Sequence, residues 1–150
     1  MAEPTPLRLL AEDGDDLKIV AAAVRDSVTK AANLKFSQRA RRFTLEINRF
    51  RWEIGEQRGR PGQRVRAILS VDEVLGVSAR GINKLDPELV VSLLDIHYEP
   101  NSEPPGGVLT LAFAGDGDIR LVVDALDVTL LDSDYVWPTR KTPSHDRRRR

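Results

Sequence analysis

The stretch FTLEINRFRWE at residues 43–53 constrains the fold most, because its apolar side chains change from odd to even positions within one continuous run. Successive side chains of a β-strand point to opposite faces of the sheet, so a flat strand cannot keep both sets on one dry face. A β-bulge at Asn48–Arg49 would insert one extra residue and return both sets to the core. We therefore predict a bent strand with these core residues: Phe43, Leu45, Ile47, Phe50 and Trp52.

Arginines accompany this stretch. Residues 39–66 contain nine arginines and three acidic residues, whereas residues 67–139 contain three basic and thirteen acidic residues. The predicted bulge turns Arg49 and Arg51 to the outer face, where they join two arginines of the next strand as candidate contacts for an anion or a partner. These candidates are Arg49, Arg51, Arg64 and Arg66. The alternative is that the basic and acidic parts face each other within the fold or in a homodimer.

Two elements are predicted before this region. LRLLAE at residues 7–12 is a candidate edge strand, and residues 13–34 predict a helix because apolar side chains recur there at helical spacing. The apolar stripe consists of Leu17, Val20, Ala21, Val24 and Val28. Acidic residues beginning at Asp13 would cap the free N–H groups of the first turn.

After this helix the apolar period becomes two, which predicts strands. Beyond the opening stretch, the candidate strands are residues 64–71, 74–82 and 89–99 and a hairpin at 108–123 that turns at Gly115–Gly117. The run LVVDALDVTLLD at residues 121–132 changes parity again. It predicts either a bent strand, which we favour, or a strand that turns into a short helix at Asp124.

The order of these elements predicts an α+β fold, with an N-terminal helix packed on a strongly bent, mainly antiparallel β-sheet or half-open barrel of about seven or eight strands. We expect residues 1–138 to form a single domain and residues 139–150 a basic, disordered tail. The chain has no cysteine, no signal-like start and no apolar run of about 18 residues. It is therefore expected in the cytoplasm, without a membrane partner.

Catalytic motifs are absent from the sequence. Asp95, His97 and Glu99 alternate on one predicted strand and would share a face, but a single histidine with nothing else converging favours a solvated face. Ser78 lacks the surroundings of a nucleophile elbow, and a hairpin turn explains Gly115–Gly117. We expect no catalytic residue, no cofactor and no metal ion, so an enzyme of unknown reaction is the weakest functional hypothesis.

Two binding functions remain. The favoured one is a non-catalytic domain that acts through a protein partner or self-association. The alternative is binding of RNA or single-stranded DNA through the arginine-rich strands of residues 39–66, where Phe50 and Trp52 would offer rings for stacking. Zero net charge disfavours nucleic acid, because nucleic-acid modules are usually strongly basic.

Several stretches resemble a known family. They are PLRLLAEDGDDL, FTLEINRFRWE, RVRAILSVDEVLGVSARGI, LTLAFAGDGDIRL and WPTRKTPSHD. Together they resemble a small alphaproteobacterial family of proteins of unknown function, number 2948 in the series of such families, over about residues 6–146. The resemblance implies a bacterial cytoplasmic protein and carries no established activity or catalytic residue.

Overall fold

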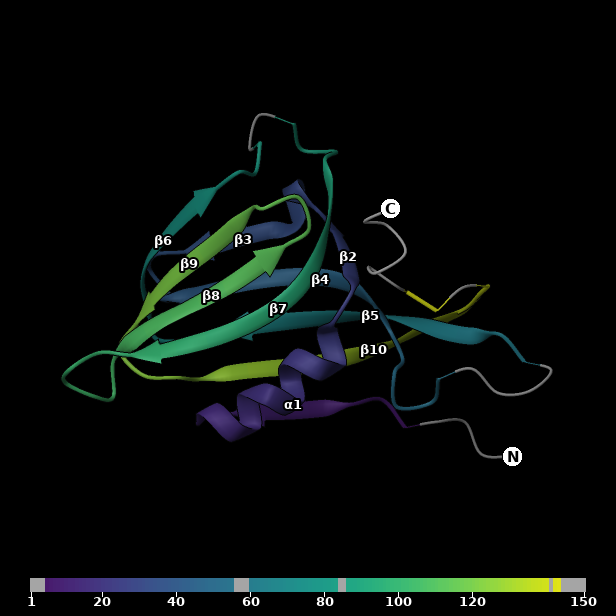
Figure 1. The fold of residues 1–150 in the computed structure, drawn as a ribbon, viewed down its shortest axis with the longest axis horizontal. Helices are drawn as coiled ribbons and strands as arrows, with labels where there is room; N and C mark the ends of the chain where they lie inside the picture. Colours follow the sequence, from purple (N-terminus) through teal and green to yellow (C-terminus); the bar gives the residue numbers. More distant parts are fainter. Residues whose placement is uncertain (1–4, 56–59, 84–85, 141, 144–150) are drawn as a thin grey trace.

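The fold consists of one α-helix and one large antiparallel sheet of ten strands, so the predicted α+β class is confirmed (Figure 1). The computed structural model describes residues 5–55, 60–83, 86–140 and 142–143. The elements are β1 (Arg8–Ala11), α1 (Gly14–Val24), β2 (Ser27–Lys30), the 3-10 turn η1 (Ala31–Asn33), β3 (Leu34–Ser37), β4 (Arg42–Phe50), β5 (Gly62–Val71), β6 (Val74–Arg80), β7 (Val90–Pro100), β8 (Gly107–Phe113), β9 (Asp118–Val123) and β10 (Val128–Thr139). No helix in these ranges is long and apolar enough to cross a membrane.

The sheet has the strand order β1-β10-β5-β4-β2-β7-β8-β9-β6, and β3 pairs beside β2 on the same edge of β4. It bends where β2 joins its two halves, because β2 pairs with β7 over four residues but with β4 through Val28 and Asn48 alone. The Thr29 hydroxyl strengthens this corner by donating to the Glu46 carbonyl oxygen at 2.6 Å. The sheet does not close into a barrel, and β1 and β6 remain its two ends.

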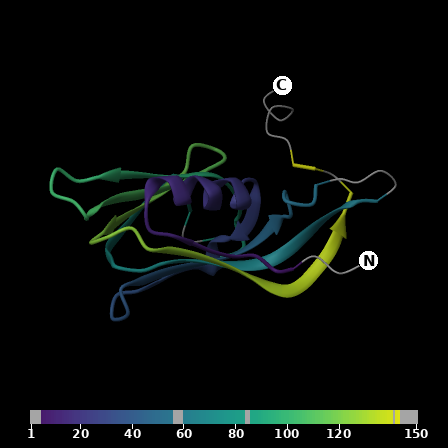
Figure 2. The same cartoon turned by 90° about the horizontal axis from the view of Figure 1, so that it is seen from below.

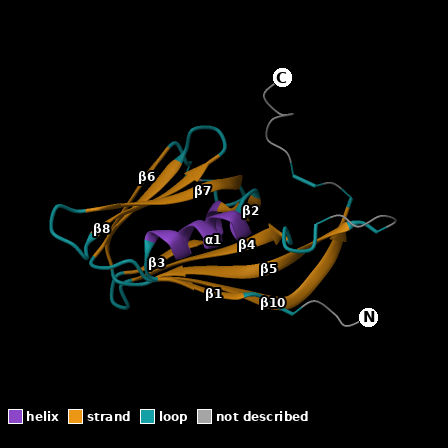
Figure 3. Cartoon of the chain, turned by 60° about the horizontal axis from the view of Figure 1, so that its bottom comes forward, coloured by secondary structure: helices purple, strands orange, loops and turns teal. Residues whose placement is uncertain are grey.

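The core lies between the two halves of the bent sheet. Helix α1 packs against β7 and β1 on the open side, where Figures 2 and 3 show it between the halves. Its residues Leu17, Val20 and Val24 are buried together with the inward side chains of the long strands. Burying this much apolar surface is the main stabilising term of the fold. The outer faces of both halves are therefore the surfaces open to other molecules.

The helix is shorter than predicted. Asp13 caps it as expected, since its carboxylate accepts a hydrogen bond from the Asp16 N–H at 2.8 Å. The helix ends at Val24, because Arg25 leaves the helical region and Asp26 has a positive φ of 61°. The next residues form β2 rather than a last helical turn, since β-branched Val28 and Thr29 suit a strand paired with β7. The predicted helix at residues 25–34 is therefore wrong.

The predicted bulge at Asn48–Arg49 is also wrong. Strands β4 and β5 pair without a register shift from Phe43 opposite Val71 to Phe50 opposite Arg64. Because the alternation is unbroken, the inward row of odd-numbered residues continues straight into Arg49. Both Arg49 and Arg51 are buried, so their predicted place on the outer face is corrected.

The second change of parity marks a crossover rather than a bent strand or a short helix. Strand β9 ends at Val123 and β10 begins at Val128, and the two strands lie in different halves of the sheet. Odd-numbered residues point inward in β9 and even-numbered residues point inward in β10, so the change of parity needs no bend within one strand. β10 continues to Thr139, and most of the predicted tail lies outside the described residues.

Candidate functional site

Two of the predicted arginines, Arg49 and Arg51, lie in a buried ionic network where the end of β4 meets Asp132 of β10. The Arg49 side chain has no exposed surface, and its Nε and Nη2 donate to the two Asp132 carboxylate oxygens at 2.8 and 2.6 Å. Nη1 and Nη2 donate to the two Glu53 oxygens at 2.9 and 2.7 Å. Asp132 also accepts from the Leu7 N–H at 2.9 Å. Two bidentate pairs satisfy Arg49 and tie β4, β10 and the segment before β1 together.

Arg51 continues the same row and is 2% exposed. Its Nη1 donates to Gln63 Oε1 at 2.9 Å, and its Nε lies 3.6 Å from Glu53 Oε2. Among the described residues its Nε and Nη2 make no hydrogen bond. Neither buried arginine can reach a partner on the surface while this end of the sheet remains folded.

The other two candidates lie on the outer side and also have partners in the fold. Arg64 donates to the Asn48 carbonyl oxygen at 2.9 Å. Arg66 is exposed, lies 3.3 Å from Glu46 and places its guanidinium 4.9 Å from the centre of the Tyr135 ring. Two further pairs join the basic region to the acidic one: Arg41 with Asp124 and Arg42 with Asp72. These contacts agree with the alternative in which basic and acidic parts meet within the fold.

The network shifts the ionisation of its members. Burial alone would raise the pKa of Glu53, but hydrogen bonds from Arg49 outweigh it and lower the pKa below its usual value. Burial would lower the pKa of Arg49, whereas the hydrogen bonds to Asp132 and Glu53 raise it. Both groups therefore stay charged at neutral pH, and Glu53 contributes stability only while it is ionised.

We expect Glu53→Gln to destabilise the protein at pH 7 by about 1–2 kcal/mol, a value reduced by the partial exposure of Glu53. Because the folded pKa is depressed, the contribution is present above the unfolded value of about 4.3 and is lost as pH falls through the folded pKa. Urea unfolding of both proteins from pH 7 to pH 3 measures this, and the gap should close in acid. A gap that stays constant with pH would contradict the assignment.

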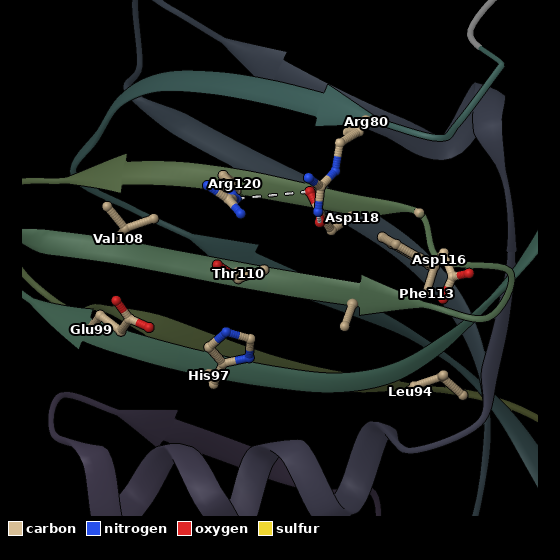
Figure 4. A pocket seen from close by; sticks show the side chains of 12 residues that line it. Arg80, Leu94, His97, Glu99, Val108, Thr110, Phe113, Asp116, Asp118 and Arg120 are labelled. Carbon is tan, nitrogen blue, oxygen red and sulfur yellow. Dashed lines mark hydrogen bonds and ion pairs between the residues drawn. The ribbon is translucent and has the colours of Figure 1, made fainter.

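A second, open site lies on the outer face of β6, β7, β8 and β9, where a hollow of about 700 Å³ crosses the strands (Figure 4). Its lining consists of Arg80, Leu94, His97, Glu99, Val108, Thr110, Ala112, Phe113, Asp116, Gly117, Asp118 and Arg120. Most of these are the outward residues of strands whose inward residues form the core. The hollow thus combines charges of both signs with an apolar floor.

One cross-strand row runs through the hollow. His97 on β7 pairs with Thr110 on β8, which pairs with Arg120 on β9. Directly paired residues of antiparallel strands lie on the same face, so these three side chains stand side by side. Figure 4 shows Thr110 between the other two. The hairpin pattern indicates that Thr110 and Arg120 point outward, because their neighbours in sequence point inward. Those inward neighbours are Leu109, Leu111, Ile119 and Leu121. That the two residues lie beside His97 depends on the register of β7.

The three weak candidates of the sequence separate here. His97 and Glu99 line the hollow, whereas Asp95 does not, and its Oδ1 accepts from the Ile96 N–H at 2.8 Å. A register irregularity between Leu93 and Asp95 interrupts the alternation at this point. No group of three or more potential metal ligands occurs within the described ranges.

The charged residues around this row differ in whether they form ion pairs. Arg80 Nη2 holds Asp118 Oδ2 at 2.6 Å, while Arg120 Nε lies 3.9 Å from Asp118 Oδ1. For Glu99 and Asp116, the described residues provide no ion pair within 4.0 Å. The Arg120 side chain lines the hollow and is about half-exposed, and among the described residues its guanidinium makes no hydrogen bond.

Comparison with known proteins yields one family. The family model described as "Protein of unknown function (DUF2948)" matches residues 7–145. No curated protein and no solved structure matches the chain.

Proposed function

Because the chain belongs to the DUF2948 family of proteins of unknown function, whose description names no activity, we propose its function from its surface. It is a non-catalytic domain that binds a partner protein through the hollow on β6, β7, β8 and β9. The observation that carries this proposal is the row of polar side chains, open to solvent, across three strands of an otherwise well-paired sheet. A cytoplasmic location accords with the lack of cysteine.

Two features support a protein partner over a nucleic acid. Of the arginines proposed to bind RNA or single-stranded DNA, the four candidates on β5 and at the end of β4 are engaged within the fold, as the Arg49–Asp132 and Arg66–Glu46 pairs illustrate. The hollow also contains three acidic side chains, which would repel a continuous chain of phosphates. Surfaces that mix both signs with apolar area are typical of protein interfaces.

Photo-crosslinking in cells tests the proposal. A photoreactive amino acid at Val108, which lines the hollow, should crosslink to a protein. The same residue at Thr129, on β10 in the other half of the sheet, is the matched control and should give none. Light scattering of the purified protein shows whether that partner is a second copy of the chain.

Three outcomes count against the proposal. These are equal crosslinking at both positions, crosslinks to RNA or DNA at Val108, and no crosslink at Val108. Steep loss of binding to single-stranded DNA with rising salt would instead support the nucleic-acid alternative. Conversion of a small molecule that requires His97 would support an enzyme.

A further inference from the structure

We propose that the row formed by His97, Thr110 and Arg120 binds the carboxylate of an acidic side chain, Asp or Glu, presented by the partner protein. The inference rests on the proposed function and names the chemical group that the hollow recognises. It concerns one defined position, above Thr110 and between the flanking residues of β7 and β9.

The first argument is the number and placement of donors. Neighbouring strands lie about 4.8 Å apart, so His97 and Arg120 stand roughly 10 Å apart across Thr110. A carboxylate between them can accept from the Thr110 hydroxyl, from a ring N–H of His97 and from the Arg120 guanidinium. Within the described part of the chain, none of these side chains donates a hydrogen bond to another group, and the nearest carboxylate to Arg120 is that of Asp118 at 3.9 Å.

The second argument is the state of Arg120. Arg80 engages Asp118 at 2.6 Å, whereas the nearest distance from Arg120 to the same carboxylate is 3.9 Å. The two terminal nitrogens of the Arg120 guanidinium can therefore donate hydrogen bonds to a ligand. An arginine fork binds a carboxylate through two parallel hydrogen bonds, which adds specificity to the charge attraction.

The third argument concerns what the hollow rejects. Glu99, Asp116 and Asp118 line it together with Arg80 and Arg120, so the five formal charges sum to −1. A polyanion that lies along the strands would meet the acidic residues, while one carboxylate above Thr110 meets donors. The apolar floor, which includes Val108 and Ala112, suits the methylene groups of an acidic side chain. The hollow therefore favours a single carboxylate.

An NMR titration of the full chain tests this inference with two peptides, acetyl-Ala-Glu-Ala-amide and acetyl-Ala-Gln-Ala-amide. The glutamate peptide should cause saturable shifts at the amides of His97, Thr110 and Arg120. Its affinity should exceed that of the glutamine peptide at least tenfold. Thr110→Val and Arg120→Gln should each lower the affinity for the glutamate peptide about tenfold. Arg8→Gln, on β1 at the far end of the sheet, is the matched control and should leave it unchanged.

Several results would overturn the inference: no saturable shift, equal affinity for both peptides, or shifts that persist in Thr110→Val and Arg120→Gln. Inorganic phosphate provides a further arm, and binding as tight as that of the glutamate peptide would show that carboxylate is not selected. If the peptides fail while crosslinking at Val108 persists, the proposed function stands and the carboxylate assignment is wrong. If crosslinking at Val108 fails as well, the hollow is not the binding surface.

Discussion

Replacing Asp132 by alanine is expected to lower the free energy of unfolding by about 3–5 kcal/mol, because it removes one partner of a buried ion pair and leaves the other buried. Neither the Asp132 nor the Arg49 side chain has exposed surface, and the two are joined by hydrogen bonds of 2.8 and 2.6 Å. The Leu7 N–H also loses its acceptor. Glu53 remains beside Arg49 but is partly exposed and cannot occupy the vacated side of the guanidinium.

The double variant Arg49→Met/Asp132→Ala separates charge burial from lost packing. With Arg49 and Asp132 both replaced, no fully buried charge of this pair is left alone, while Glu53 is partly exposed and keeps Arg51 Nε at 3.6 Å. The double variant should therefore be more stable than Asp132→Ala alone. Urea unfolding followed by circular dichroism gives the free energy of unfolding of the wild type, of Asp132→Ala and of the double variant. Glu46→Gln is the matched control, because the Glu46–Arg66 pair is exposed and its loss should cost less than about 1 kcal/mol. A cost for Asp132→Ala as small as that of Glu46→Gln would mean that Arg49 is solvated.

The parts of the fold that the sequence predicts correctly depend on neighbouring residues. Asp13 reaches the N–H of Asp16 three positions later, and the hairpin of β8 and β9 closes within the span from Phe113 to Gly117. Asp116 adopts a positive φ of 67° in that turn, as a tight hairpin connection requires. Such features are encoded within a few residues and can be read without knowing the tertiary structure.

The incorrect predictions concern segments whose structure depends on a residue far away in the sequence. Arg49 continues the inward row of β4, and its burial is tolerated because Asp132, 83 positions later, reaches it from β10. A rule that buries apolar residues and exposes charged ones needs a bulge at this point, whereas a buried carboxylate makes the bulge unnecessary. The helix prediction fails in the same way, since β2 forms by pairing with β7, whose paired residues lie 60 to 66 positions further along the chain.

The candidate site was predictable in part for the same reason. Alternation along β7 places His97 and Glu99 on one face, and both line the hollow. Thr110 and Arg120 were missed, because their place beside His97 depends on the register of three strands. An isolated histidine in a sequence carries little information, but the register gives it two neighbours with compatible hydrogen-bonding groups.

The second prediction of a large loss of stability concerns Phe50, on the even-numbered face of β4. Phe50 points away from the main core but has no exposed surface, because Trp52 covers it at 4.7 Å between ring centres. Trp52 is held there by a hydrogen bond of 2.8 Å from its Nε1 to the carbonyl oxygen of Arg25, just after α1. The change of parity in the opening stretch therefore reflects two buried faces at one end of a strand: an ionic one and an aromatic one.

Phe50→Ala is accordingly expected to lower the free energy of unfolding by about 3–5 kcal/mol, the usual cost of truncating a buried aromatic side chain. Ile68→Ala is the matched control, since Ile68 lies on the same outer face of the sheet but is half-exposed, and its loss should cost about 1 kcal/mol or less. Urea unfolding of both variants, with tryptophan fluorescence as one probe, gives the comparison. Equal costs would show that the ring of Phe50 is open to solvent. In that case Phe50 and Trp52 would be available for stacking, and the nucleic-acid alternative would regain its aromatic contacts.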